Sequence, residues 1–424
     1  MSLTAIVIFI KRPVDTVRFR SPSKRLKERR GTANILTARR FALNKKLLTT
    51  AILAATASAA HAQSSVTLYG LIDAGVSYVN HSKSASGSDK LFKYDDGIAQ
   101  GSRWGLRGAE DLGGGLKAIF VLENGFNSGN GTIGQGGAIF GRQAYVGLSH
   151  KDAGTLTFGR QYSFTTDILG ANYSTGGNTV AGNYAYHVND IDQLTSSRIN
   201  NAVKFQSANY AGFTFGALYG FSNSTSFAGA PATTTGTTTT PGSSRAYSFG
   251  LNYANGPIGL GAAYTDIRYP SQATPAFTTN IANLTISNVR DLRSFGVGGR
   301  YIWGPATLWA LWTNTRLEPV TGGSTTYNAY EAGGKYAFTT ALSAGVGYTY
   351  SRVSGANSGH WNQVNGALDY ALSKRTDVYL LAIYQEASGK NLQAQIGSST
   401  SYFNTSGTGS KNQFAARVGI RHKF

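Results

Sequence analysis

The chain of 424 residues contains no cysteine, a single methionine and only 9 prolines. Without cysteine it can form no disulfide bond, no cysteine-ligated zinc site and no thiol nucleophile. Charged residues are also scarce, at 14 % of the chain against roughly 25 % in an ordinary globular protein. Glycine and aromatic residues are abundant instead, with 53 Gly, 24 Tyr and 21 Phe. This composition argues against the soluble domains, about two or three, that the length alone would suggest.

Long apolar runs are absent as well. From Gln63 onward, no stretch of about 18 consecutive apolar residues occurs, so the sequence predicts no membrane-spanning helix. Apolar residues instead occupy every second position over about ten residues, the length that a tilted membrane-spanning strand requires. In 342–351, for example, Leu, Ala, Val, Tyr and Tyr alternate with Ser, Gly, Gly, Thr and Ser. The same alternation occurs in 66–78 and in 414–424.

The connections between these segments alternate between short and long. Short turns are predicted at 111–115, 151–154, 208–212, 255–259, 304–305, 338–340 and 373–376. Longer polar stretches are predicted at about 80–101, 124–139, 162–198, 222–245, 265–292, 314–328, 352–360 and 386–411. Linkers between small domains do not explain this pattern, because domains of about 25 residues without cysteine or metal cannot bury a core.

The fold class that follows is all-β: a transmembrane antiparallel up-and-down β-barrel of about 16 strands, with short periplasmic turns and long extracellular loops. An even number of strands places both termini on one side. Closure also removes the unpaired strand edges that lipid does not tolerate. About sixteen strands leave an interior too wide for side chains to fill, so we expect an aqueous channel.

The basic excess lies mainly near the N-terminus. Residues 1–62 contain 13 of the 39 Lys and Arg and 2 of the 20 Asp and Glu, so the net charge of +19 falls to +8 for 63–424. This distribution argues against a nucleic-acid partner. Within 44–62, two lysines, a short apolar stretch and Ala-His-Ala follow one another, which predicts a signal peptide cleaved before Gln63. We interpret 1–43 as a non-native upstream extension and 63–424 as the barrel domain.

Four segments, in this order, carry a resemblance to a known family: 63–70 (QSSVTLYG) with Asp73 after it, 102–108 (SRWGLRG), 110–118 (EDLGGGLKA) and 142–148 (RQAYVGL). Together they resemble the general, non-specific porins of Gram-negative β-proteobacteria, over essentially all of 63–424. The resemblance implies an outer-membrane homotrimer for the passive diffusion of small hydrophilic solutes and ions, surrounded by lipid and lipopolysaccharide. It implies that the third long loop, about 162–198, folds into each pore. The terminal Phe424 resembles the signal read by the outer-membrane assembly machinery.

The selectivity of a channel depends on its width and on the charges at its narrowest point. Arg103 and Arg107 alternate with Trp104 and Leu106, so both arginines are expected to face the lumen, where charge is tolerated. Lys117 and Glu123 are expected to face inward by the same reasoning. The resemblance implies a basic cluster on the wall, and its best matches are Arg103, Arg142 and Arg198.

The register of Arg142 is left open by the sequence. Simple alternation places it with Ala144 and Val146 on the lipid face, unless a bulge or an early strand start turns it inward. Opposite the basic cluster, we assign three acidic residues of the third loop to the constriction: Asp167, Asp190 and Asp192. The alternative is that these residues are merely solvated. Arginines facing aspartates would create a transverse field, and the net charge of +8 for 63–424 predicts a mild preference for anions.

Two other functions fit the sequence less well. A solute-specific outer-membrane channel would need a file of aromatic side chains along the lumen, whereas the tryptophans are better interpreted as residues of the membrane interface. An enzyme would need a catalytic constellation. The five histidines after residue 62 form no metal-binding spacing such as HExxH, and 407–411 (GTGSK) lacks the spacing of a phosphate loop. We therefore expect no enzymatic activity, no cofactor and no metal.

Overall fold

The computed structural model describes residues 65–84, 87–195, 197–223, 227, 230, 233–235, 238–240, 243–269, 289–355, 358–390, 392–397 and 409–424. The predicted signal peptide at 44–62 and the upstream extension at 1–43 lie outside these described residues. Within the described ranges, no helix is long and apolar enough to cross a membrane.

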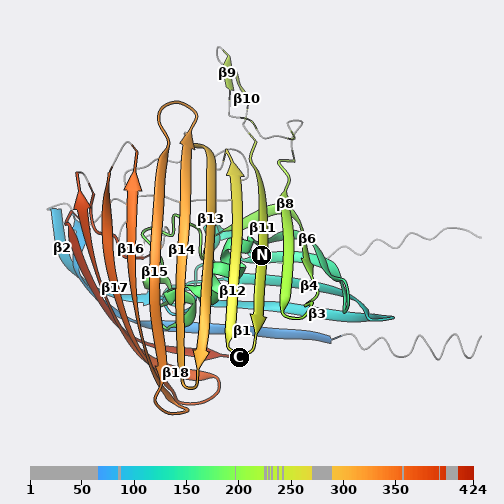
Figure 1. Ribbon diagram of the computed structural model, residues 1–424, viewed down its shortest axis with the longest axis horizontal. Coiled ribbons are helices and arrows are strands. Elements are labelled where there is room, and N and C mark those ends of the chain that lie inside the picture. The colour runs from blue at the N-terminus through green and yellow to red at the C-terminus, as the bar shows by residue number, and fades with distance from the viewer. Residues whose placement is uncertain are drawn as a thin grey trace, which may run out of the picture. The chain divides into compact units, whose positions relative to one another are not determined.

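Seventeen strands form one antiparallel sheet that closes on itself (Figure 1). Closure occurs between β1 (Ser65–Ser84) and β19 (Asn412–Lys423). On its other edge, β1 pairs with two strands that lie end to end, β2 (Gly87–Asp96) and β3 (Arg103–Gly113). Residues 97–102 separate these two strands. Because β2 and β3 share one position around the wall, the 17 strands fill 16 positions, as the sequence predicted.

The other wall strands follow in chain order, each antiparallel to the next. They are β4 (Leu116–Gly125), β5 (Gln143–His150), β6 (Gly154–Tyr162), β7 (Arg198–Ser207), β8 (Phe213–Gly220), β11 (Arg245–Asn255), β12 (Ile258–Arg268), β13 (Val289–Trp303), β14 (Ala306–Pro319), β15 (Thr325–Ala337), β16 (Leu342–Ser354), β17 (Gly359–Ala371) and β18 (Thr376–Gly389). A separate hairpin of β9 (Thr233–Thr235) and β10 (Thr238–Thr240) lies in the connection from β8 to β11. All seven predicted short turns fall between consecutive wall strands, so these predictions are confirmed.

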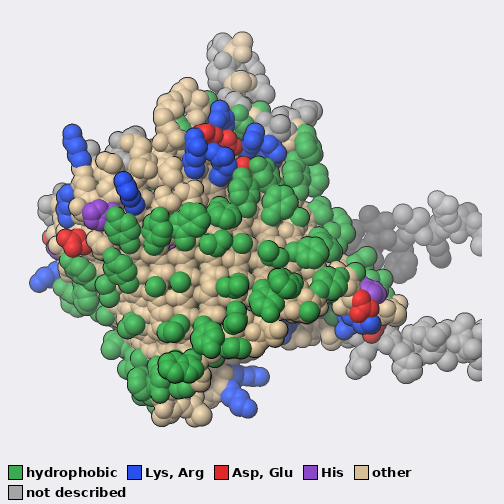
Figure 2. Space-filling view, in the orientation of Figure 1, with side chains coloured by type: hydrophobic (Ala, Val, Ile, Leu, Met, Phe, Trp, Pro, Cys, Tyr) green, Lys and Arg blue, Asp and Glu red, His purple; other side chains and the backbone are tan. Residues whose placement is uncertain are grey.

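The barrel is apolar outside and polar inside, as the alternation predicted. In β1, Val66, Leu68 and Val76 are exposed on the outer face, whereas Asp73 and Ser77 are fully buried inside. Figure 2 shows the resulting hydrophobic side chains across the face of the wall that is turned to the viewer. A band of such side chains suits the hydrocarbon core of a bilayer, and a polar interior suits a wet lumen.

The prediction of a long loop at 80–101 is wrong. β1 continues to Ser84, and β2 begins at Gly87, so most of this polar stretch belongs to a hairpin. The same holds for 314–328, where β14 ends at Pro319 and β15 begins at Thr325. These strands extend past the apolar band, where no lipid requires an apolar outer face. Their polar composition therefore resembles that of a loop.

A buried ion cluster lies at the seam where the barrel closes. Arg417 of β19 donates to Asp95 of β2, and its Nη2 lies 3.3 Å from Asp73 Oδ1 of β1. Its Nε donates to the Tyr379 hydroxyl of β18 at 2.9 Å. Nearby, the terminal Phe424 exchanges two backbone hydrogen bonds with Gly70, at 3.0 and 3.2 Å. The cluster thus joins the first and last strands of the chain; a role of Phe424 in assembly stays a prediction.

Replacing Arg417 with Met should destabilise the barrel strongly. The change leaves the buried Asp73 without the arginine that contacts it and leaves Asp95 with only Lys93, whose Nζ lies 3.5 Å from Asp95 Oδ2. Removing one partner of a buried ion pair typically costs about 3–5 kcal/mol. The measurement is the temperature at which the folded form loses its faster mobility on a detergent gel. Arg375→Met, in the exposed turn between β17 and β18, is the matched control and should behave like the wild type. Equal transition temperatures for all three proteins would contradict a stabilising seam cluster.

Candidate functional site

The connection from β6 to β7 folds into the barrel. Residues 163–197 form four short helical segments, η3 (Thr165–Gly170), α2 (Ala171–Tyr173), α3 (Thr175–Asn178) and α4 (Gly182–Ala185). Figure 1 shows these helices in the interior, enclosed by the wall strands. We call 163–197 the inner loop. The prediction that the third loop folds into the pore is confirmed, and the strand ends at Tyr162 and Arg198 agree with the predicted bounds.

Glycines on the inner face of the wall make room for this loop. A Cβ atom on Gly261 of β12 would lie 2.3 Å from the ring of Tyr173, and one on Gly298 of β13 would lie 2.5 Å from the Tyr173 Cβ. Both distances are shorter than any real contact of a Cβ atom. The Tyr173 hydroxyl donates to Asn252 Oδ1 of β11 at 2.5 Å. Glycine therefore lets the loop backbone and its aromatic side chains approach the wall closely.

One polar anchor fixes the inner loop to β14 and β15. His187 lies between two carboxylates: its Nδ1 contacts Asp192 of the loop, and its Nε2 lies 3.0 Å from Glu331 Oε2 of β15. Thr313 of β14 donates to Asp192 Oδ2 at 2.6 Å. Burial alone would lower the pKa of His187, but Asp192 and Glu331 outweigh it and raise the pKa to about 10. The buried imidazole is therefore charged at neutral pH.

A second anchor holds the other side of the loop. The Asn183 backbone N–H donates to the Ile98 carbonyl at 2.7 Å, and its side-chain amide donates to the Gly97 carbonyl at 2.6 Å. Both carbonyls belong to 97–102, the segment that interrupts the row of β2 and β3. Asp73 holds this segment in turn, because its Oδ2 accepts from the Gln100 N–H at 2.8 Å. Backbone groups that a continuous strand would pair within the sheet thus bind the loop instead.

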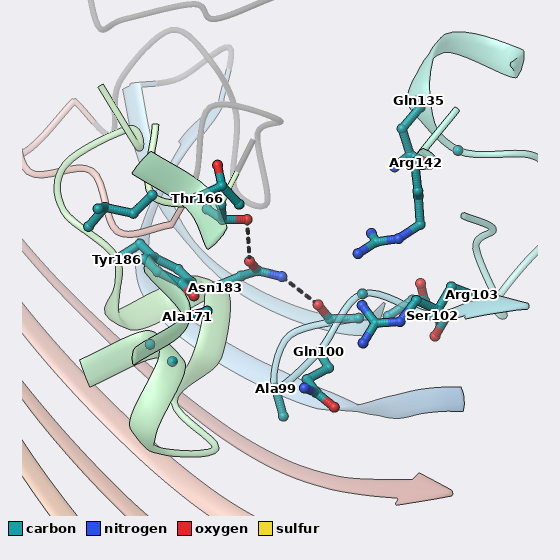
Figure 3. A pocket seen from close by; sticks show the side chains of 18 of the residues that line it. Ala99, Gln100, Ser102, Arg103, Gln135, Arg142, Thr166, Ala171, Asn183 and Tyr186 are labelled. Atoms are coloured by element: carbon teal, nitrogen blue, oxygen red, sulfur yellow. Dashed lines mark hydrogen bonds between the residues drawn. The ribbon is translucent and has the colours of Figure 1, made fainter. Parts of the chain in front are cut away.

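A cavity of about 630 Å³ lies between the inner loop and the wall. Four arginines belong to its lining: Arg103, Arg142, Arg198 and Arg421. Two carboxylates also line it, Asp96 and Asp167. Figure 3 shows Arg103 and Arg142 on one side and the loop residues Asn183 and Tyr186 on the other.

Neighbouring side chains hold these arginines in place. Arg142 Nε donates to Glu123 Oε1 at 2.8 Å, and Arg103 Nε lies 3.8 Å from Glu123 Oε2. The Arg198 guanidinium lies 4.9 Å from the centre of the Tyr162 ring and donates to its hydroxyl at 3.2 Å. Fixed cations of this kind attract anions without first having to be ordered.

The structure brings together only some of the residues predicted for the site. Arg103, Arg142, Arg198 and Asp167 line one cavity, whereas four others do not: Arg107, Lys117, Asp190 and Asp192. Both of these acids are buried: Asp192 accepts from Thr313 of β14, and Asp190 accepts from the Thr195 N–H of the loop itself at 3.1 Å. β5 starts at Gln143, so Arg142 precedes the strand, which removes the conflict with its alternation.

Two basic residues near the cavity were not predicted from the sequence. Arg421 lies on the polar face of the last strand and could have been found from that alternation. Lys204 of β7 lies 2.5 Å from Asp167 Oδ2 and neutralises it, a pairing that nothing local in the sequence indicates. Within the described part of the chain, no three His, Asp or Glu side chains converge in a way that could hold a metal ion.

Comparison with known proteins gives consistent matches. A family model described as Gram-negative porin matches residues 49–392. Outer membrane porin protein 32 of Delftia acidovorans is 30 % identical over 90 % of this chain and all of its own length. An outer membrane porin protein of Bordetella pertussis is 38 % identical over 61 % of this chain and 66 % of its own. The solved anion-selective porin from Comamonas acidovorans has a TM-score of 0.67 at 26 % identity, over 85 % of this chain and all of that one.

The charged His187 makes the stability of the loop dependent on pH. Because its pKa is raised to about 10 in the folded protein, its contribution is complete below about pH 6.5 and is lost as the pH rises towards 10. The thermal stability of the wild type should therefore decrease over this range more steeply than that of His187→Gln. Melting curves followed by circular dichroism across the range measure this difference. Parallel pH profiles for the two proteins would contradict a charged His187.

Proposed function

The chain belongs to the Gram-negative porin family, and on that premise we propose that this outer-membrane channel prefers anions and selects them at the cavity beside the inner loop. The observation that carries the proposal is the charge of the lining: four arginines against two carboxylates. One of these carboxylates, Asp167, is already paired with Lys204. A small anion in the cavity therefore meets a positive potential, which the low-dielectric wall strengthens.

The selectivity that we propose differs in origin from a simple transverse field. The loop acids Asp190 and Asp192 do not line the cavity, and Asp192 is paired with the charged His187. Glu123 offsets part of the charge of Arg103 and Arg142, but Arg198 and Arg421 add to the lining, so the potential in the cavity stays positive. The solved relative that is described as anion-selective is consistent with this proposal.

A solute-specific channel receives less support. Such a channel needs aromatic rings that a solute can touch along the lumen. Trp309 and Trp361 are both buried, so their interpretation as membrane-interface residues is wrong. The Trp309 Nε1 donates to Thr175 of the inner loop at 3.1 Å. These rings are covered by protein. General diffusion of small hydrophilic solutes and ions fits the site better.

The assembly is also part of the proposal. The family resemblance implies a homotrimer in contact with outer-membrane lipid and lipopolysaccharide, inserted by the assembly machinery that recognises a terminal aromatic residue. The exposed side chain of Phe424 supports the last of these contacts.

Reversing the charges of Arg103 and Arg198 should shift selectivity towards cations. In planar bilayers of neutral lipid with a potassium chloride gradient, the zero-current potential of the wild type should have the sign of anion preference. Arg103→Glu together with Arg198→Glu should reverse that sign, because the cavity then carries excess negative charge. An unchanged potential would remove both residues from the selective part of the pore.

Arg107→Glu together with Lys117→Glu is the matched control. It makes the same change in charge on residues that do not line the cavity. Arg107 lies four residues beyond Arg103, about 13 Å along a strand, which exceeds the screening length of about 10 Å in 0.1 M salt. We expect a clearly smaller shift from this variant. A shift as large as that of the first pair would mean that the charge of the whole lumen, and not the cavity, sets the selectivity.

A further inference from the structure

On the outer face of four neighbouring strands, β11 to β14, the type of side chain changes from one row of residues to the next. The registers place Leu251, Ala262, Val297 and Trp312 in one row across these strands. The next outward-facing row contains Phe249, Tyr264, Phe295 and Asn314. Two further rows follow, first Tyr247, Asp266, Arg293 and Arg316, then Arg245, Arg268, Asp291 and Glu318. The surface thus passes from apolar to aromatic to charged, with roughly 7 Å between successive rows.

The charged rows contain an arginine cluster built around two carboxylates. Asp291 lies 3.1 Å from Arg268 and 3.4 Å from Arg290. Glu318 lies 2.8 Å from Arg290, 3.1 Å from Arg316 and 3.9 Å from Arg293. Arg290 reaches this face through the irregularity in register between Val289 and Asp291. We call these four arginines and two carboxylates the arginine belt.

The belt presents its positive groups outward. The side chains of Arg268, Arg290, Arg293 and Arg316 are 40, 46, 36 and 44 % exposed, whereas those of Asp291 and Glu318 are 8 and 22 % exposed. The carboxylates therefore lie beneath the guanidinium groups and hold them together. Two positive charges remain in excess, and including the flanking Arg245 and Asp266 leaves that excess unchanged. In Figure 2 this patch lies over the upper ends of β12 to β14, above the hydrophobic band.

We propose that the arginine belt is a binding site for the phosphate groups of an anionic lipid in the outer leaflet. The adjacent aromatic row marks the interface between hydrocarbon and headgroups, so the belt lies at headgroup depth. Guanidinium groups bind phosphate with paired hydrogen bonds, and four of them around a common centre match a multiply charged headgroup. Binding is direct, because a surface whose exposed groups are cationic needs no divalent metal to bridge it to a phosphate.

This site is separate from the pore. The belt residues face outward, whereas the selective cavity lies inside the barrel between the wall and the inner loop. The proposal rests on the outer-membrane location of the porin but not on its ion selectivity. Lipid binding and conductance can therefore be tested independently on the same protein.

The experiment measures retention of diphosphorylated lipid A by the purified protein in neutral detergent, using native mass spectrometry. Wild type should bind the lipid in the presence of EDTA, and lipid A without phosphates should bind weakly. Arg293→Gln together with Arg316→Gln should weaken binding by about tenfold, as expected when charge-assisted hydrogen bonds are lost. Arg293→Lys together with Arg316→Lys keeps the charge but not the paired donors, and should give an intermediate loss. Inorganic phosphate, added as a competitor, should displace the lipid poorly if the acyl chains contribute through the apolar rows.

Lys374→Gln together with Arg375→Gln is the matched control, with the same loss of charge in an exposed turn at the other end of the barrel. It should bind lipid A like the wild type. Equal loss in both double variants, or loss of binding in EDTA, would overturn the proposal of direct binding at the belt. Conductance in neutral bilayers should be unchanged in all variants, which shows that each barrel is folded. A protein that binds lipid but forms no channel would contradict the proposed function and leave the belt intact.

Discussion

The constraint on which the structure depends is that no backbone hydrogen-bonding group can face lipid without a partner. The sheet satisfies this constraint by closing through the pairing of β1 with β19. Closure with 16 strand positions fixes a lumen that wall side chains alone cannot fill. The buried cluster of Arg417, Asp73 and Asp95 stabilises the point where the two ends of the chain meet.

The lumen is wide enough to hold the inner loop. The loop occupies part of the interior because wall glycines such as Gly261 and Gly298 leave space for Tyr173. Polar anchors then fix it on two sides, through His187 to Glu331 and through Asn183 to the interrupted wall strand. What remains open is a cavity with an arginine-rich wall. Closure makes room for the docked loop, and the docked loop leaves the cavity at which we propose that anions are selected.

Much of the fold could be predicted because the relevant signals are local. Alternation in 66–78 assigned Val66 and Asp73 to opposite faces, and the composition of short turns located seven of the connections. The hairpin at 80–101 was missed because its strands leave the membrane, where the alternation of apolar and polar residues no longer applies. The arginine belt could not be predicted from the sequence, because the rows across β11 to β14 depend on the registers of four strands.

The candidate site was less predictable because its contacts join distant parts of the chain. His187 and Glu331 are separated by 144 residues, and Lys204 and Asp167 by 37. Composition identifies Asp190 and Asp192 as loop acids, but only the docked loop shows that Asp192 accepts from Thr313 of the wall. Arg103 was predicted from simple alternation. Arg142 required knowledge of where β5 begins.

From the inner loop's position inside the barrel (Figure 1), beside the arginine-lined cavity, we infer that it sets the narrowest part of the pore. The most direct measurement is single-channel conductance, together with the size of the neutral polymers that can enter, for a variant in which 171–186 are replaced by a short Gly-Ser linker. The wall closes without these residues, so the account predicts a folded barrel with higher conductance and access for larger polymers. Unchanged conductance and an unchanged size limit would show that the narrowest part lies elsewhere and would contradict the account.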